Sequence, residues 1–278
     1  MATRVFPLAL ALLLVGCASA APAPPLEVLS FNVRYANPGD GANAWEHRAA
    51  FVIELLRRED PDLLGLQEAL PEQLAELRAA LPGYRVLGRG RDAGGGGEHA
   101  ALLVRASRFD VIEAGDFWLS PTPDEEASRG WDAALPRICT WAVLRDREGG
   151  AELLAMNAHF DHRGSEARRR SALVLLDRRA RFAELPLVLT GDLNAGEGSD
   201  PLAALRAGGL RDTFRDAWPE ADQVGTFHGF RGGTGGEKID YVLVGAGWET
   251  LDAAILHDRE GRRYPSDHYP VRARIRRR

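Results

Sequence analysis

Cysteine is scarce in this sequence, with only Cys17 and Cys139 among 278 residues. Two cysteines do not make a disulfide framework, and Cys139, within an apolar stretch, is expected to be a buried free thiol. An excess of basic charge is also missing, because the formal net charge is −5 and the isoelectric point is about 5.9. A non-specific nucleic-acid binder usually has a basic surface, which this chain as a whole lacks. The sequence also contains no internal repeat, coiled-coil heptad or interdomain linker.

The composition is that of an ordinary globular protein, with 45% hydrophobic and 27% charged residues. Residues 26–278 have the length of one large domain, which we predict them to form as a monomer. The last residues, Arg272 to Arg278, are strongly basic and are expected to be a solvated tail.

The first 25 residues are predicted to be a targeting segment followed by a tether. Arg4 precedes an apolar run that is too short to span a membrane as a mature helix, and residues 1–20 have signal-peptide proportions. Small residues before Cys17 resemble the bacterial lipoprotein signal, in which the cysteine is lipidated, which implies a lipid-anchored protein of the cell envelope. The alternative is cleavage after Ala20 and secretion as a soluble protein. Residues 21–25, rich in Pro and Ala, would be a stiff tether.

Hydrophobic periodicity predicts strands that alternate with helices in the first half, followed by several strands. Strands are predicted at 26–34, 63–68, 84–87, 98–105, 111–119, 138–144, 152–160, 185–194, 239–244, 250–257 and 269–275, and helices at 45–58, 71–81, 166–182 and 201–207. Residues 121–134 are expected to be a long surface loop, and the glycine-rich residues 89–97 either a linker or a mobile lid. This order favours an α+β fold with two packed sheets and helices outside.

Polar side chains stand at the ends of five or six of the predicted strands. For example, the apolar run from Leu185 ends in Asp192 and Asn194, whose side chains leave the strand on the same side. Each such residue alone has an ordinary explanation, such as a turn or a helix cap. Their recurrence indicates a ligand site, because ligands bind where strand ends gather. The set comprises Asn32, Glu68, Asn157, His159, Asp192, Asn194, Asp240, Asp267 and His268.

Six short motifs contain these residues: Phe31-Asn32, Gln67-Glu68, Asn157-x-His159, Gly191-Asp192-x-Asn194, Ile239-Asp240-Tyr241 and Ser266-Asp267-His268. In this order they resemble the endonuclease/exonuclease/phosphatase superfamily of metal-dependent phosphoesterases. The stretches 136–141, 157–162 and 226–230 are similar to a bacterial secreted subgroup related to the deadenylase-type branch. The resemblance implies a DNase I-like fold, which is a four-layer α/β sandwich with two mainly antiparallel sheets.

The resemblance also implies a Mg²⁺ ion, for which Mn²⁺ is a substitute. Glu68 is the first candidate ligand, with Asn32 and Asp267 as supporting ligands or as residues that hold the ligands. Mg²⁺ prefers such oxygen ligands together with substrate phosphate. The metal would polarise the scissile phosphate and neutralise charge as the leaving oxygen departs.

The remaining motif residues take catalytic roles by the same resemblance. Asp192 is expected to activate or orient the attacking water, and Asn194 and Asn157 to contact phosphate oxygens. His268 is expected to donate to the phosphate in the pentacovalent state. Asp240 would fix the tautomer of His268 and favour its imidazolium form.

His159 has two interpretations. In the branches that carry a histidine here, it is the general acid for the leaving group, supported by a glutamate at the place of Glu98. Such a His–Glu pair is expected to raise the imidazole pKa. Alternatively, His159 only helps to hold the metal-site network.

Arg137 and Arg168 are candidates for bidentate phosphate binding, or else for surface ion pairs; Asp161 and His162 are secondary candidates.

The substrate stays open between nucleic acid, a lipid head group as in sphingomyelinases, and inositol or other sugar phosphates. The rival interpretation is a catalytically silent binding protein on the same fold. Its degenerate site would be expected to lack one of the motif residues, all of which are present.

Overall fold

The computed structural model describes residue 2 and residues 24–278. The predicted signal peptide, its Cys17 and all of the predicted tether except Pro24 and Pro25 lie outside the described residues. These two prolines are fixed to the folded chain, because Arg108 donates hydrogen bonds of 3.0 Å to both of their carbonyl oxygens. Among the described residues, no helix combines the length and the hydrophobicity needed to cross a membrane.

The first sheet has six strands in the order β11-β12-β1-β2-β4-β3. Their bounds are β1 (Leu26–Asn32), β2 (Leu63–Ala69), β3 (Tyr84–Leu87), β4 (His99–Arg105), β11 (Trp248–Ile255) and β12 (Val271–Arg277). Only β1 and β2 pair in parallel, while the other neighbours are antiparallel. The expected solvated tail at Arg272 to Arg278 is therefore wrong. Val271, Ala273 and Ile275 point into the core, so the arginines between them are the outer face of a paired strand.

The second sheet repeats this plan with the order β5-β6-β7-β8-β10-β9. Its strands are β5 (Phe109–Trp118), β6 (Ile138–Asp146), β7 (Glu152–His159), β8 (Leu187–Asp192), β9 (Arg211–Asp212) and β10 (Asp240–Val244). Again one pair, β7 with β8, is parallel and the rest are antiparallel. The prediction of two mainly antiparallel sheets is confirmed.

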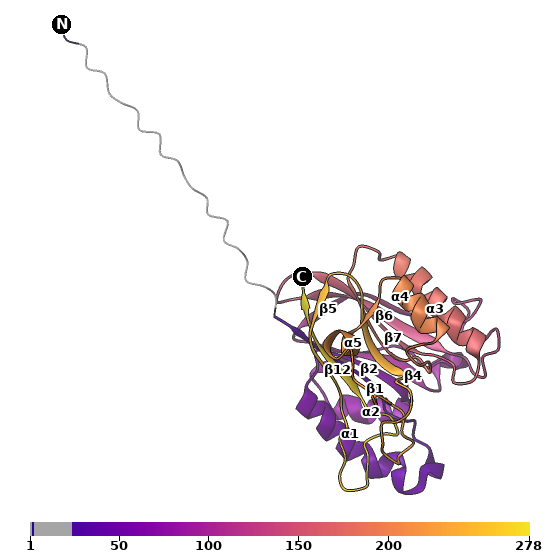
Figure 1. The fold of residues 1–278 in the computed structure, drawn as a ribbon. Helices are drawn as coiled ribbons and strands as arrows, with labels where there is room; N and C mark the ends of the chain where they lie inside the picture. The colour runs from indigo at the N-terminus through magenta and orange to yellow at the C-terminus, as the bar shows by residue number, and fades with distance from the viewer. Residues whose placement is uncertain (1, 3–23) are drawn as a thin grey trace.

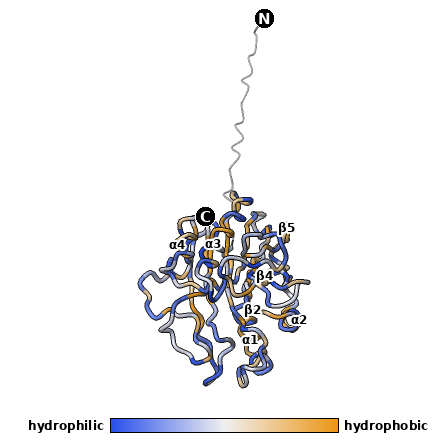
Figure 2. Tube along the Cα trace, turned by 90° about the vertical axis from the view of Figure 1, so that its right-hand side faces the viewer, coloured by the Kyte–Doolittle hydropathy of each residue, from blue (hydrophilic) through white to orange (hydrophobic). Residues whose placement is uncertain are grey.

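Helices cover the outer face of each sheet, which gives four layers (Figure 1). The helices are α1 (Trp45–Glu59), α2 (Pro71–Ala80), α3 (Ser165–Ala180), α4 (Asp200–Ala207) and α5 (Thr213–Ala217), with 3₁₀ turns at Pro38–Asn43 and Ala93–Gly95. One apolar cluster joins α1 and α2 to the first sheet, another joins α3 and α4 to the second, and a third lies between the sheets. Figure 2 shows hydrophobic residues along the inner strands and hydrophilic residues over the outer loops.

The two sheets approach each other most closely around Gly65 of β2. A Cβ atom at this position would lie 2.0 Å from Oγ1 of Thr190 in the facing sheet, so only glycine fits. Beside it, the Ser30 hydroxyl accepts a hydrogen bond of 3.0 Å from the Gly191 amide. These contacts bring the central strands of both sheets together near the ends that carry the polar motifs.

The short elements β9 and α5 were not predicted, because a strand of two residues and a helix of barely more than one turn carry too little periodicity to read. Residues 121–134 form the expected loop without a helix or strand, and Cys139 is a buried free thiol as expected.

Candidate active site

The polar motif residues meet because their strands end at one edge of the sandwich. In β7, β8 and β10 the register places His159 and Asp240 on either side of Asp192. In the facing sheet, Asn32 ends β1 next to Gln67 of β2. Side chains from both sheets therefore converge on the same space.

This space is a cavity of about 690 Å³. The residues that line it are Arg34, Tyr35, Glu68, Arg91, Glu98, Leu135, Arg137, His159, His162, Asp192, Asn194, Phe227, Ile239, Asp267 and His268. Of the predicted site residues, Asn32 and Asp240 do not line the cavity but hydrogen-bond to residues that do. Asn32 contacts Glu68 and Asp192, and Asp240 contacts His268. Asn157 and Arg168 do not line the cavity.

Asn32 holds two of the carboxylates. Its Nδ2 donates to Oε1 of Glu68 at 3.0 Å and to Oδ2 of Asp192 at 2.9 Å, while its Oδ1 accepts from the Arg34 amide. Glu68 lies at an irregularity of β2 and has a φ of 63°, a left-handed conformation that costs energy outside glycine and is enriched at functional sites. This arrangement favours Asn32 as the residue that orients the carboxylates over Asn32 as a direct ligand.

The donor set fits a divalent metal ion. Glu68, His159 and Asp192 each offer a ligand atom within 4.8 Å of the others. Burial raises the pKa of Asp267, and the nearby Glu68 adds to this effect. Arg34 lies 4.0 Å from Glu68 and 3.9 Å from Asp267. Carboxylate oxygens gathered in this way are suited to a hard cation such as Mg²⁺.

Asp240, His268 and Asp192 form a chain of charged groups across the cavity. Nδ1 of His268 lies 2.9 Å from Oδ2 of Asp240, and its Nε2 lies 3.9 Å from Oδ2 of Asp192. Burial opposes the imidazolium, but Asp240 more than compensates and holds the pKa of His268 well above its usual range. Burial, together with the Asp240 carboxylate, raises the pKa of Asp192 to about 7.

The structure places Glu98 beside His159 as predicted, but it also gives Glu98 a closer partner. Glu98 lies 3.8 Å from Nδ1 of His159, but both of its oxygens pair with Arg91 at 2.6 and 2.8 Å. Burial, then Arg137 and Arg91, hold the pKa of His159 well below its usual range. The expected rise of the imidazole pKa is therefore wrong. A neutral His159 within 3.6 Å of Asp192 favours its role in the metal-site network over that of a general acid.

Asn157 does not offer an amide to a phosphate in this structure. Its Nδ2 donates to the carbonyls of Leu66 and Ala101, and its Oδ1 accepts from Gln67 and Thr190. All four hydrogen-bonding positions are thus used inside the protein, three toward the facing sheet and one toward Thr190 of the neighbouring strand β8. The geometry supports a structural role instead of the predicted phosphate contact.

The two candidate arginines have different surroundings. Arg137 is buried and lines the cavity, so it is not part of a surface ion pair. Arg168 lies outside the cavity and donates to the Asp161 carbonyl at 3.0 Å. Asn194, which has a φ of 46°, lines the cavity and donates from its Nδ2 to the Phe160 carbonyl, and its second N–H stays available to a ligand.

Sequence reasoning missed Arg34, Arg91 and Phe227 as lining residues. Arg34 could have been found, since it follows Asn32 by two residues. Arg91 lies in the glycine-rich loop, where no pattern marks its pairing with Glu98. Phe227 is 48% exposed and its ring lies 5.0 Å from that of His268.

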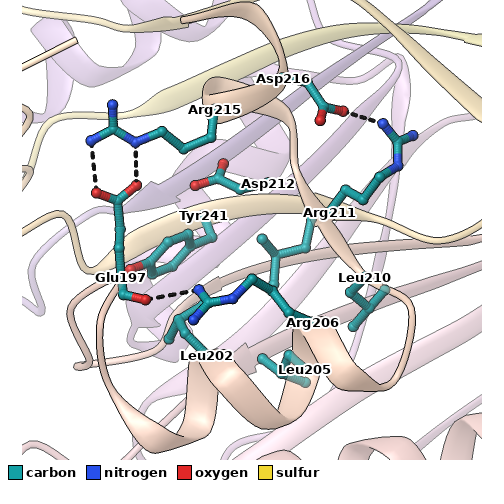
Figure 3. Close-up of a pocket in the computed structure, with 11 residues that line it drawn as sticks. Glu197, Leu202, Leu205, Arg206, Leu210, Arg211, Asp212, Arg215, Asp216 and Tyr241 are labelled. Carbon is teal, nitrogen blue, oxygen red and sulfur yellow. Dashed lines mark hydrogen bonds and ion pairs between the residues drawn. The ribbon is translucent and has the colours of Figure 1, made fainter. Parts of the chain in front are cut away.

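A second cavity, of about 480 Å³, lies beside α4 and α5 (Figure 3). Because Asp240 and Tyr241 are consecutive in β10, Tyr241 points away from the first cavity and into this one. Figure 3 shows Arg215 paired with Glu197 through two hydrogen bonds, of 2.7 and 2.8 Å. The described residues that line it include no histidine, and four of its charged side chains form the ion pairs Arg215–Glu197 and Arg211–Asp216. The catalytic groups therefore belong to the first cavity.

The sequence model of the Endonuclease/Exonuclease/phosphatase family matches residues 29–268, which include every motif described above. The chain belongs to this family. Its members are metal-dependent phosphoesterases, so the predictions of family, fold and enzyme class are confirmed.

Solved structures of similar proteins support this assignment. An endonuclease/exonuclease/phosphatase family protein of Bacteroides thetaiotaomicron is 36% identical with a TM-score of 0.85, over 92% of this chain and 98% of that chain. A mannosyl-6-phosphatase of the same organism is 36% identical with a TM-score of 0.84, over 90% and 99%. The human Nocturnin catalytic domain, at 20% identity and a TM-score of 0.73, over 92% and 96%, shares the fold.

Two curated relatives are uncharacterized proteins of Acanthamoeba polyphaga mimivirus, 24% and 26% identical over 64% and 55% of this chain. The chain spans 31% and 60% of their lengths.

Proposed function

We propose that the chain is a Mg²⁺-dependent hydrolase of small phosphoesters. The observation that carries the proposal is the convergence on one cavity of Glu68 and Asp192, both held by Asn32, with His268, held by Asp240. The 36% identity to a mannosyl-6-phosphatase supports a sugar phosphate as substrate. The cavity volume of about 690 Å³ agrees with this substrate, because it lies in the range of small-molecule sites.

In this proposal Glu68 holds the metal ion, with Asp267 beside it and Asn32 orienting the carboxylate. When bound, the ion polarises the scissile phosphate and offsets the charge on the leaving oxygen. The oxygen-rich donor set supports Mg²⁺, with Mn²⁺ as a substitute.

Asp192 orients the attacking water and accepts its proton as the water attacks in line with the leaving group. A pKa of about 7 suits a general base that works near neutral pH. Asn194 and Nε2 of His268 donate to phosphate oxygens. Asp240 holds Nδ1 of His268, so that Nε2 carries the proton that faces the substrate.

We further propose that the enzyme acts outside the cytoplasm, anchored to the cell envelope by lipid on Cys17, with soluble secretion as the alternative. The pattern of residues 1–20 supports this location. Leu26, the first residue of β1, lies about 20 Å along the strand from Asn32 at the site, so this strand begins away from the cavity. Membrane association of the full chain should be lost in Cys17→Ser, and unchanged association would exclude the anchor.

The activity is tested with purified residues 21–278. Substrates are p-nitrophenyl phosphate, bis-p-nitrophenyl phosphate, hexose phosphates, inositol phosphates, sphingomyelin and nucleic acid, each with Mg²⁺ and with EDTA. We expect hydrolysis of hexose phosphates that requires the metal, by a protein that elutes as a monomer. Activity indifferent to EDTA, or none on any phosphoester, would contradict the proposal.

A further inference from the structure

Arg137 is a buried guanidinium whose two terminal nitrogens, among the described residues, have imidazoles and no carboxylate as hydrogen-bond partners. Its side chain is 4% exposed. Nη1 lies 3.0 Å from both ring nitrogens of His159, and Nη2 lies 2.8 Å from Nδ1 of His162. The two terminal nitrogens, which in arginine match the oxygens of a carboxylate or phosphate, therefore meet imidazoles.

The nearest carboxylates are committed elsewhere. Asp161 lies 3.5 Å from Nε of Arg137, and its oxygens accept from the backbone amides of Ala134, Leu135, Arg163 and Gly164. Glu98 forms a bidentate ion pair with Arg91. Arg91 is itself 9% exposed and lines the same cavity together with Glu98, so the charges of this pair balance each other and Arg137 is left, in the described part of the chain, as the charge without a paired carboxylate at its fork.

The opposite end of the cavity has the reverse charge. Glu68, Asp192 and Asp267 line it with Arg34 between two of them. His159 separates the two ends, since its Nε2 lies 3.6 Å from Asp192 while Arg137 contacts the same imidazole. An anion on the fork of Arg137 is therefore a different group from a phosphate held beside Asp192 and His268.

We propose that Arg137 binds a second acidic group of the substrate, so that the preferred substrate is a small phosphoester whose leaving alcohol also carries a phosphate or carboxylate. This inference rests on the proposed function for the position of the scissile phosphate. His162 is exposed, so its ring has room to turn away from Nη2 as the acidic group arrives. The incoming anion supplies the counter-charge that the buried guanidinium lacks.

Binding is measured by titration calorimetry with Mg²⁺ on residues 21–278 carrying Asp192→Asn, which prevents turnover. The probes are glucose 6-phosphate, glucose 1,6-bisphosphate and 6-phosphogluconate. The first has no second acidic group, the second adds a phosphate, and the third adds a carboxylate. We expect both acidic probes to bind about 10-fold or more tightly than glucose 6-phosphate, as for a hydrogen-bonded charge pair. Adding Arg137→Gln should remove this preference, and Arg137→Lys should keep part of it. Arg169→Gln, on the outer face of α3, is the matched control and should keep all of it.

Equal binding of the three probes to the Asp192→Asn protein would overturn the inference. An equal loss of affinity for all three on Arg137→Gln would also overturn it, because Arg137 would then contact the phosphate common to all. Hydrolysis by the wild-type protein of the phosphoesters that test the proposed function is measured separately. Its absence would contradict the proposed function and leave the binding preference as an independent result. Thermal melts identify a variant that fails to fold. If Arg137→Gln does not fold, the inference is still tested by Arg137→Lys and by the binding preference of the protein that carries Asp192→Asn alone.

Discussion

Nδ1 of His268 lies 2.9 Å from Oδ2 of Asp240, and both side chains are almost fully buried. The other oxygen of Asp240 has no hydrogen-bond partner within the described part of the chain. The charge of Asp240 therefore acts mainly on His268, which keeps the imidazolium stable in a buried position.

This pair predicts the alkaline limb of the pH–rate profile. The pKa of His268 is raised above its usual range, so the imidazolium form is retained at neutral pH and activity falls as the pH rises through that raised pKa. In Asp240→Asn the compensating charge is absent, while burial continues to favour the neutral ring. We expect the alkaline limb of kcat/KM to move to lower pH. A limb that stays in place would show that this ionisation does not control the reaction.

Replacement of the metal-holding carboxylate predicts a change in metal affinity. In Glu68→Gln one carboxylate charge is lost, so the Mg²⁺ concentration for half-maximal activity should rise by at least about 10-fold. The measurement is a Mg²⁺ titration of hydrolysis after removal of metal with EDTA. Glu72→Gln, an exposed position of α2, is the control and should follow the wild-type curve. The same Mg²⁺ dependence in both variants would remove Glu68 from the metal site.

Asn157 is predicted to affect stability more than substrate binding. Asn157→Ala leaves the partners of its amide, including the carbonyls of Leu66 and Ala101, without hydrogen bonds in the core. The free energy of unfolding should fall by about 2–4 kcal/mol, because each such buried group costs about 1–3 kcal/mol. Denaturant unfolding gives this value, and KM of the folded variant should stay near that of the wild type. A large rise in KM with little loss of stability would restore Asn157 as a phosphate contact.

Much of this fold could be predicted from the sequence because its strands are long, apolar and end in polar motifs. The register that places His159, Asp192 and Asp240 side by side follows from strands that the hydrophobic pattern marks clearly. The basic run at Arg272 was misjudged as a solvated tail, although a strand was predicted at 269–275, and Val271, Ala273 and Ile275 of that strand face the core. On a half-buried strand such alternation carries more information than the net charge.

The roles of individual side chains were harder to predict, because they depend on which partner is nearest in space. The sequence places Glu98 at the start of a strand near His159, but it does not reveal that Arg91 takes both of its oxygens. Likewise, the motif containing Asn157 does not show whether its amide faces the cavity or the other sheet. Hydrogen bonds between distant segments decide both cases.

The most direct test of the proposed mechanism is kcat of Asp192→Asn at saturating Mg²⁺ and substrate. The substitution keeps the size of the side chain and removes the base, so kcat should fall by about 10²–10⁴-fold, with an unchanged melting temperature as evidence of folding. Asp177→Asn, at an exposed position of α3, should retain wild-type kcat. An Asp192→Asn enzyme with wild-type kcat would contradict the assignment of the reaction to this cavity.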